Sequence, residues 1–148
     1  MPKHIVVIDD CKVVQAMASD YLGAAGFRVS TADDGVYSNH LIYSRTPPDL
    51  ILLDIVMPLM SGEKKLKLLK SREKSRNIPV LLISSKEERE LREIGAACGA
   101  DGCLSKPFTE DQLVLSVRSL LPARAAQRRP LPLQVRPEQE KLPLASGN

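Results

Sequence analysis

The residues best suited to chemistry are acidic and stand where short strand-like runs end. Asp54 follows the apolar run 50–53, and Asp9 with Asp10 follows a second, mostly β-branched run, 4–8. Continuous runs of this kind are typical of strands whose two faces are covered by helices in a parallel sheet. Because the carboxyl ends of parallel strands meet at one edge, we expect the three carboxylates to lie together. An Asp54 that only caps the following turn is the alternative.

Two more polar side chains follow predicted strands, Ser84 after the run 79–83 and Lys106 after 102–105. Three carboxylates in one crevice repel each other unless a cation lies among them, and oxygen ligands suit a hard divalent ion. Mg²⁺ is the best candidate, because Ca²⁺ needs more protein oxygens and no His or Cys is placed to favour zinc. Lys106 and Ser84 could hold phosphoryl oxygens. The pattern predicts a phosphoryl-transfer site with Asp54 as nucleophile.

The segments that must position these residues alternate between strand and helix patterns. Strands are predicted at 4–8, 27–31, 50–53, 79–83 and 102–105, and helices at 12–25, 36–45, 62–74, 87–98 and 109–121. Five strands alternating with five helices predict an α/β fold with a doubly wound, five-stranded parallel sheet. The helix at 36–45 has the poorest helix formers, whereas the helix at 109–121 opens with a capping box.

Composition indicates one ordinary soluble domain. The chain has 148 residues, of which 43% are apolar and 26% charged. No apolar run approaches the roughly 20 residues of a membrane span, and the polar first residues do not begin a secretory signal. We therefore expect a cytoplasmic location and no membrane partner. The three cysteines are odd in number and lack Cys-x-x-Cys spacing, which argues against a disulfide framework and a structural zinc site.

The net positive charge of the chain comes from its last residues. Of 21 basic and 18 acidic residues, five basic and two acidic ones lie in 123–148, which leaves 16 of each in 1–122. The segment 123–148 is also rich in Pro and Arg. We expect a folded domain over 1–122, and a disordered tail or linker over 123–148. A tail that contacts nucleic acid or an acidic partner is the alternative.

In their order and spacing, these motifs resemble the receiver domain of bacterial two-component response regulators, in the single-domain, chemotaxis-type (CheY-like) form. The resemblance covers about residues 3–121. It implies a flavodoxin-like strand order 2-1-3-4-5 and a signalling domain that catalyses only its own phosphorylation and hydrolysis. The motifs that carry it are Asp9-Asp10, Leu53-Asp54 with Met57-Pro58 and Gly62, the strand 80–84, Gly99-Ala100-Asp101 and Lys106-Pro107-Phe108.

The resemblance also implies roles for the site residues. Asp54 would accept a phosphoryl group from a phosphohistidine on a sensor histidine kinase or phosphotransfer protein. Asp10, Asp54 and the Val56 carbonyl would bind Mg²⁺ directly, and Asp9 would act through water. Lys106 would pair with the phosphoryl group, and the Lys106–Pro107 peptide bond is cis in relatives.

A switch is implied as well. Phosphorylation would draw the Ser84 hydroxyl inward and rearrange the face formed by the fourth helix, fifth strand and fifth helix, which a downstream protein or output domain would recognise. A homodimer formed on phosphorylation is a further candidate complex. Relatives carry Tyr or Phe at the position of Cys103, so here the switch either relies on the Ser84 loop or is weak. Packing and a redox role are the two interpretations of Cys103 itself.

Four other residues depart from the family pattern or tune it. Val56 and Lys86 stand where the family controls the access of water to the phosphoaspartate, and because Val56 cannot orient water we expect a long-lived phosphoryl group. Asn39 and Lys65 stand where relatives tend to have apolar residues. This hints at loosely packed second and third helices or at a surface altered for a partner.

Two other functional hypotheses remain open. The chain could be the receiver module of a larger regulator whose output domain is absent, or a receiver-like scaffold that binds proteins without phosphorylation. The 26 residues after Pro122 have neither the length nor the apolar content for a helix-turn-helix. Direct sequence-specific DNA binding by this chain is therefore not expected.

Overall fold

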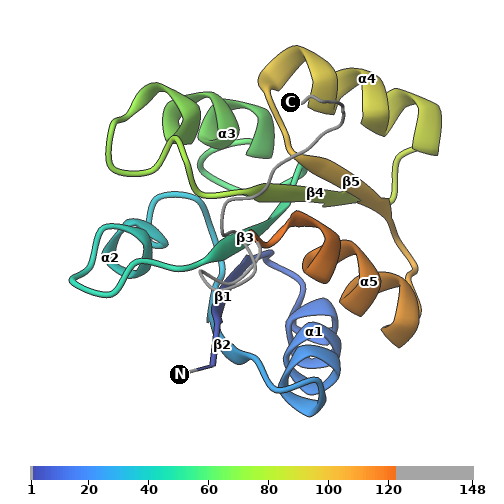
Figure 1. The fold of residues 1–148 in the computed structure, drawn as a ribbon. Coiled ribbons are helices and arrows are strands. Elements are labelled where there is room, and N and C mark those ends of the chain that lie inside the picture. The colour runs from blue at the N-terminus through green and yellow to red at the C-terminus, as the bar shows by residue number, and fades with distance from the viewer. Residues whose placement is uncertain (1, 123–148) are drawn as a thin grey trace, which may run out of the picture.

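The computed structural model describes residues 2–122, in which strands and helices alternate along the chain (Figure 1). The strands are β1 (His4–Ile8), β2 (Arg28–Ala32), β3 (Leu50–Asp54), β4 (Val80–Ser84) and β5 (Gly102–Ser105). The helices are α1 (Lys12–Ala24), α2 (Asn39–Ile42), α3 (Gly62–Ser71), α4 (Glu88–Cys98) and α5 (Glu110–Leu120). The strands form one parallel sheet in the order β2-β1-β3-β4-β5. The predicted fold class and strand order are confirmed.

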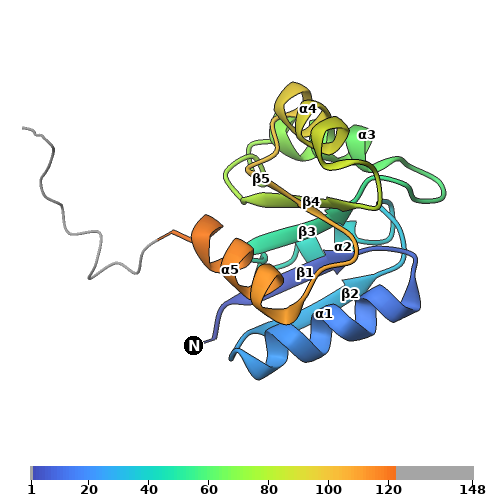
Figure 2. The same cartoon turned by 90° about the vertical axis from the view of Figure 1, so that its right-hand side faces the viewer.

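The sheet lies between two layers of helices, with α1 and α5 on one face and α3 and α4 on the other (Figure 2). Alternate residues of β1 point to opposite faces of the sheet. Ile5 and Val7 pack with α1 and α5, whereas Val6 and Ile8 pack with α3 and α4. Every residue of β1, β3 and β4 is buried. Burial on both faces explains the unbroken apolar runs, and each such side chain contributes roughly 1.5–3 kcal/mol.

The strand register brings the carboxyl ends of β1, β3, β4 and β5 together. β1 ends at Ile8 opposite Leu53, one residue before Asp54, and β4 ends at Ser84 opposite Ser105. The segments that follow β1 and β5 therefore begin beside the ends of β3 and β4. The edge of the sheet formed by these carboxyl ends holds the candidate site.

The segment between β2 and β3 differs most from the sequence expectation. The predicted helix at 36–45 is wrong in extent, because α2 covers only Asn39–Ile42. The Asp34 carboxylate accepts hydrogen bonds from the backbone N–H groups of Val36 and Tyr37, at 2.9 and 2.7 Å. Such local bonds between side chain and backbone compete with a helix, and here they replace its first turn.

The other predicted boundaries agree with the structure to within three residues. α5 begins with the predicted capping box, in which Thr109 and Gln112 each bind the other's backbone N–H. No helix within residues 2–122 is long and apolar enough to cross a membrane. The predicted tail, 123–148, lies outside the described residues.

Candidate functional site

Three carboxylates gather at the carboxyl edge of the sheet, as the strand ends predicted. One oxygen each from Asp9, Asp10 and Asp54 can be chosen so that all three lie within 4.8 Å of one another. Asp9 is fully buried and Asp54 is 5% exposed, whereas Asp10 faces solvent. The cluster thus joins two desolvated carboxylates to one that remains open to solution.

Backbone contacts fix the buried Asp9 in place. Its N–H continues the β1–β2 ladder by donating to Ala32 O at 3.1 Å. Its carboxylate Oδ1 accepts the N–H of Cys11 at 2.9 Å, which closes the turn into α1. Because these contacts fix the turn after β1, Asp9 and Asp10 lie near the end of β3, the strand that pairs with β1.

Gly62 allows α3 to begin directly against the end of β3. Its N–H donates to Ile55 O at 2.8 Å, and a Cβ at this position would lie 2.1 Å from Asp54 O. Backbone atoms cannot yield to such a contact, so only glycine fits here. The close approach holds the loop that follows Asp54.

Lys106 supplies the positive charge of the site. Its Nζ lies 2.7 Å from Asp9 Oδ2 and 3.4 Å from Asp54 Oδ1. Lys106 N also donates to Ser84 O at 2.8 Å, which extends the β4–β5 pairing and aims the residue at the edge of the sheet. The Lys106–Pro107 peptide bond is cis, as the resemblance predicted.

The electrostatics of the carboxylate cluster favour a bound cation. Burial, followed by the charge of Asp9, raises the pKa of Asp54, while Lys106 and the Val56 N–H oppose this rise. Burial opposes the charge of Lys106, but its hydrogen bond to Asp9 and the charges of both aspartates outweigh burial and raise its pKa. One ammonium faces three carboxylates, so negative charge is left over.

The donor set fits a hard divalent ion. Asp9, Asp10 and Asp54 offer only oxygen atoms, at the spacing that a single ion can bridge. Carboxylates in this number suit Mg²⁺, which keeps part of its water shell. Asp10 is exposed, so the cluster can be reached from solution on that side.

Ser84 stands at the end of β4, next to β3, and is 1% exposed. Its Oγ accepts the N–H of Lys86 at 3.1 Å. The Lys86 side chain pairs with Glu90 Oε2 at 3.5 Å, on the first turn of α4. The segment after β4 is thereby tied to both the Ser84 hydroxyl and α4. Val56, by contrast, is 65% exposed beside Asp54.

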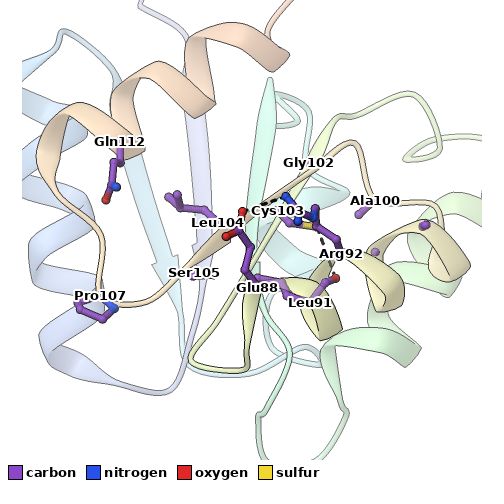
Figure 3. A pocket seen from close by; sticks show the side chains of 12 residues that line it. Glu88, Leu91, Arg92, Ala100, Gly102, Cys103, Leu104, Ser105, Pro107 and Gln112 are labelled. Carbon is purple, nitrogen blue, oxygen red and sulfur yellow. Dashed lines mark hydrogen bonds and ion pairs between the residues drawn. The ribbon is translucent and has the colours of Figure 1, made fainter.

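Cys103 does not join the acidic cluster. It lines a groove of about 620 Å³ between α4, β5 and the start of α5 (Figure 3). Its Sγ donates a weak hydrogen bond to Leu91 O at 3.6 Å, and a Cβ on Gly95 would lie 2.6 Å from that sulfur. Burial raises the pKa of the thiol. A small residue packed against α4 is therefore favoured over a reactive thiolate.

Two polar contacts were missed at the sequence level. Gln15 is buried on α1 and reaches the carbonyl of Asp9, and Lys65 on α3 reaches Asn39 on α2. The second contact joins two polar residues that stand where the resemblance led us to expect apolar ones. A polar residue at an inward-facing position of a predicted helix could have indicated each contact, but the sequence does not reveal which partner it binds.

Comparison with known proteins places this geometry in a family. Residues 5–118 match the family model described as "Response regulator receiver domain". The crystal structure of the chemotaxis response regulator CheY4 of Vibrio cholerae is similar over 82% of this chain and all of that one, with a TM-score of 0.73 and 28% identity.

Curated relatives share the same domain. A Mycobacterium tuberculosis protein described as "Probable transcriptional regulatory protein TcrX" is 37% identical over 120 residues, covering 81% of this chain and 50% of its own length. The phosphate regulon transcriptional regulatory protein PhoB of Klebsiella pneumoniae is 34% identical over 122 residues, covering 82% and 52%. The chain spans about half the length of these relatives. With its fold, its carboxylate cluster and these matches, the chain belongs to the response regulator receiver domain family.

Proposed function

We propose that this chain is a phosphorylation switch of a two-component phosphorelay, in which Asp54 accepts a phosphoryl group from a phosphohistidine on a sensor histidine kinase or phosphotransfer protein. The observation that carries the proposal is the position of Asp54. It is buried beside two other aspartates, and a lysine lies 3.4 Å from its carboxylate. A cap for a turn needs neither the extra carboxylates nor the lysine.

The residues have complementary parts in the transfer. A carboxylate oxygen of Asp54 forms the bond to phosphorus while the phosphorus–nitrogen bond of phosphohistidine breaks, and the imidazole keeps the electron pair. Asp9, Asp10, Asp54 and the Val56 carbonyl would hold Mg²⁺, which offsets the charge of the phosphoryl oxygens when bound. Lys106 stays within reach of the new group as its counter-charge.

The output follows from the added charge. A phosphoryl group brings about −1.5 to −2 charges and three acceptor oxygens to Asp54. The Ser84 hydroxyl accepts a hydrogen bond from Lys86 N, so its own proton is available to a phosphoryl oxygen. Turning that hydroxyl would release Lys86 and, through Glu90, disturb α4 at the edge of the groove. The groove between α4 and β5 is where a downstream protein or a second copy would sense the change.

A receiver module within a larger regulator is the second candidate. It is favoured by one observation, that the curated relatives are about twice as long as the matched region. In that case the same face of α4, β5 and α5 would act on an attached output domain. The phosphorylation chemistry is the same in both candidates.

Intact-mass measurement tests the proposal. The chain is incubated with acetyl phosphate, with Mg²⁺ or with EDTA, and compared with Asp54→Asn and with Asp20→Asn, a matched change at an exposed aspartate of α1. We expect one phosphoryl adduct that needs Mg²⁺, persists in Asp20→Asn and disappears in Asp54→Asn. If neither acetyl phosphate nor a phosphorylated kinase yields an adduct, the chain is not a phosphorylation switch, and a phosphate-independent scaffold takes its place.

A further inference from the structure

We propose that Gln15 is a positioning residue of the acidic site, because its amide group holds the turn that carries Asp9 and Asp10. The inference rests on the proposed Mg²⁺ site and adds a residue outside the carboxylate cluster. It concerns this chain's own hydrogen bonds, which span α1, the turn after β1 and the end of β2.

The geometry uses both hydrogens of one amide nitrogen. Gln15 Nε2 lies 2.6 Å from the backbone oxygen of Asp9 and 2.7 Å from Asp33 Oδ1. An amide nitrogen has two hydrogens, so each acceptor can receive one. Gln15 is 7% exposed, so water has little access to replace it. The amide thus clamps the turn after β1 to the residue that follows β2.

Asp33 makes a firm anchor for this clamp. Its Oδ1 also accepts Lys12 Nζ at 2.7 Å. The hydrogen bond from Lys12, followed by that from Gln15, holds the pKa of Asp33 below its usual value. Asp33 therefore stays a charged acceptor, and hydrogen bonds to charged acceptors are the stronger ones.

The turn needs such a clamp. Cys11, the N-cap residue of α1, makes no side-chain capping hydrogen bond, and the first turn of α1 has no acidic residue. Repulsion among the carboxylates tends to open the same turn. If Gln15 were lost, the buried carbonyl of Asp9 would lose a donor, and an unsatisfied buried acceptor drives the backbone to shift. Such a shift would move two of the three carboxylates at once.

Three substitutions separate positioning from simple packing. Gln15→Leu fills a similar volume but donates no hydrogen bond. Gln15→Glu keeps the shape but places a negative charge against two acceptors. Gln15→Arg keeps several N–H donors and can restore both contacts. Positioning predicts that Arg rescues Mg²⁺ binding and that Leu and Glu do not, whereas packing predicts that Leu is tolerated best and Arg worst.

Isothermal titration calorimetry with MgCl₂ on the 148-residue chain measures the effect. We expect the Mg²⁺ Kd to rise about fivefold or more in Gln15→Leu, further in Gln15→Glu, and to stay within about twofold of native in Gln15→Arg. Asp20→Asn, at an exposed position of α1 outside these contacts, is the control, and its Kd should stay within about twofold of native. Without Mg²⁺, amide hydrogen exchange at Cys11 should be faster in Gln15→Leu than in native chain.

Urea unfolding shows that each variant is folded, and Gln15→Asn, whose amide is one methylene too short, replaces Gln15→Leu if the latter does not fold. A native Kd in Gln15→Leu, or an Arg variant that binds more weakly than the Leu variant, would overturn the role of Gln15 while leaving the Mg²⁺ site intact. A native chain that binds no Mg²⁺ would overturn the site itself, and the inference with it.

Discussion

Lys106 and Lys65 are both largely buried, but they lie in surroundings of different charge. Lys106, at the carboxyl edge of the sheet, has carboxylates at 2.7 and 3.4 Å. Lys65, between α2 and α3, is only 2% exposed, and the one hydrogen bond of its ammonium group within residues 2–122 goes to the uncharged oxygen of Asn39, at 2.5 Å. The more deeply buried lysine is thus the one without an acidic partner.

The pKa values of the two ammonium groups shift in opposite directions. At Lys106 the effect of burial is outweighed by Asp9 and Asp54, and the pKa rises. At Lys65 burial, with the charge of Arg72 adding to it, lowers the pKa to about 8. Burial alone therefore does not identify a functional lysine. The excess of carboxylates around Lys106 is what the proposed Mg²⁺ site requires, whereas Lys65 is desolvated without a compensating charge.

Lys106→Met should have the largest effect on stability, because it leaves two aspartates buried without a cation. Breaking a buried ion pair costs about 3–5 kcal/mol, and the Lys106 side chain is 18% exposed, so we expect a loss of about 2–4 kcal/mol in urea unfolding with EDTA. Mg²⁺ should recover much of this loss. Lys12→Met, at an exposed ion pair, is the control and should change the stability little. Native stability of Lys106→Met in EDTA would contradict the comparison.

Asn39→Leu should have the next largest effect on stability, because it removes the acceptor of the Lys65 ammonium. A buried donor without a partner costs about 1–3 kcal/mol, and at pH 7 deprotonation of the amine limits the cost to about 1–2 kcal/mol. In the double variant Asn39→Leu with Lys65→Met, the stability should return to the native value or exceed it. Urea unfolding of the native chain, the two single variants and the double variant gives the coupling free energy between Asn39 and Lys65. A stabilising Asn39→Leu on its own would show that Lys65 does not need this acceptor.

The pH dependence of stability sharpens the comparison further. The pKa of Lys65 is about 8 in the folded chain and about 10.4 when unfolded. Between these values the unfolded state binds more protons, so the free energy of unfolding should rise with pH, by about 1 kcal/mol per unit after allowance for screening. Asp34, which favours the charged form, moderates the shift. Unfolding at pH 7, 8.5 and 10 should show this rise in native chain and in Lys67→Met, but not in Lys65→Met. Equal slopes in all three would assign the rise to other groups.

Val56→Asn should have the smallest effect, on the lifetime of the phosphoryl group beside Lys106. Val56 is 65% exposed, and its side chain has no group that could hydrogen-bond to water. An amide there can orient water, so we expect hydrolysis to be about threefold faster or more, which is about 0.7 kcal/mol. Loss of the adduct is followed by intact mass, with Leu115→Asn on the exposed face of α5 as the control. A lifetime in Val56→Asn equal to that of the native chain would count against the role of Val56.

The sequence predicted the site more readily than the contacts around it. Strand ends could be located because buried strands are continuous apolar runs, and parallel pairing then places Asp9, Asp54 and Lys106 at one edge. The extent of α2 could not be predicted, since it depends on how the Asp34 carboxylate competes for backbone N–H groups. The clamp of Gln15 depends on the rotation of α1, which periodicity fixes too coarsely.

The pair of Lys65 and Asn39 shows another limit. Each residue on its own suggested loose packing of the second and third helices. In the structure they bind each other, and the aliphatic part of Lys65 lies against Gly35, with Cδ 3.4 Å from where a Cβ would stand. Two unusual residues far apart in the sequence explain one another only once the helices are docked.

Localisation of the phosphoryl group tests the central claim most directly. The chain is treated with acetyl phosphate and Mg²⁺, reduced with sodium borohydride, which converts an acyl phosphate on aspartate to homoserine, and mapped by tandem mass spectrometry. The account predicts homoserine in place of Asp54 alone, and none when EDTA replaces Mg²⁺. Conversion at Asp9 or Asp10 instead, or at no aspartate while a phosphorylated kinase is also supplied, would contradict it.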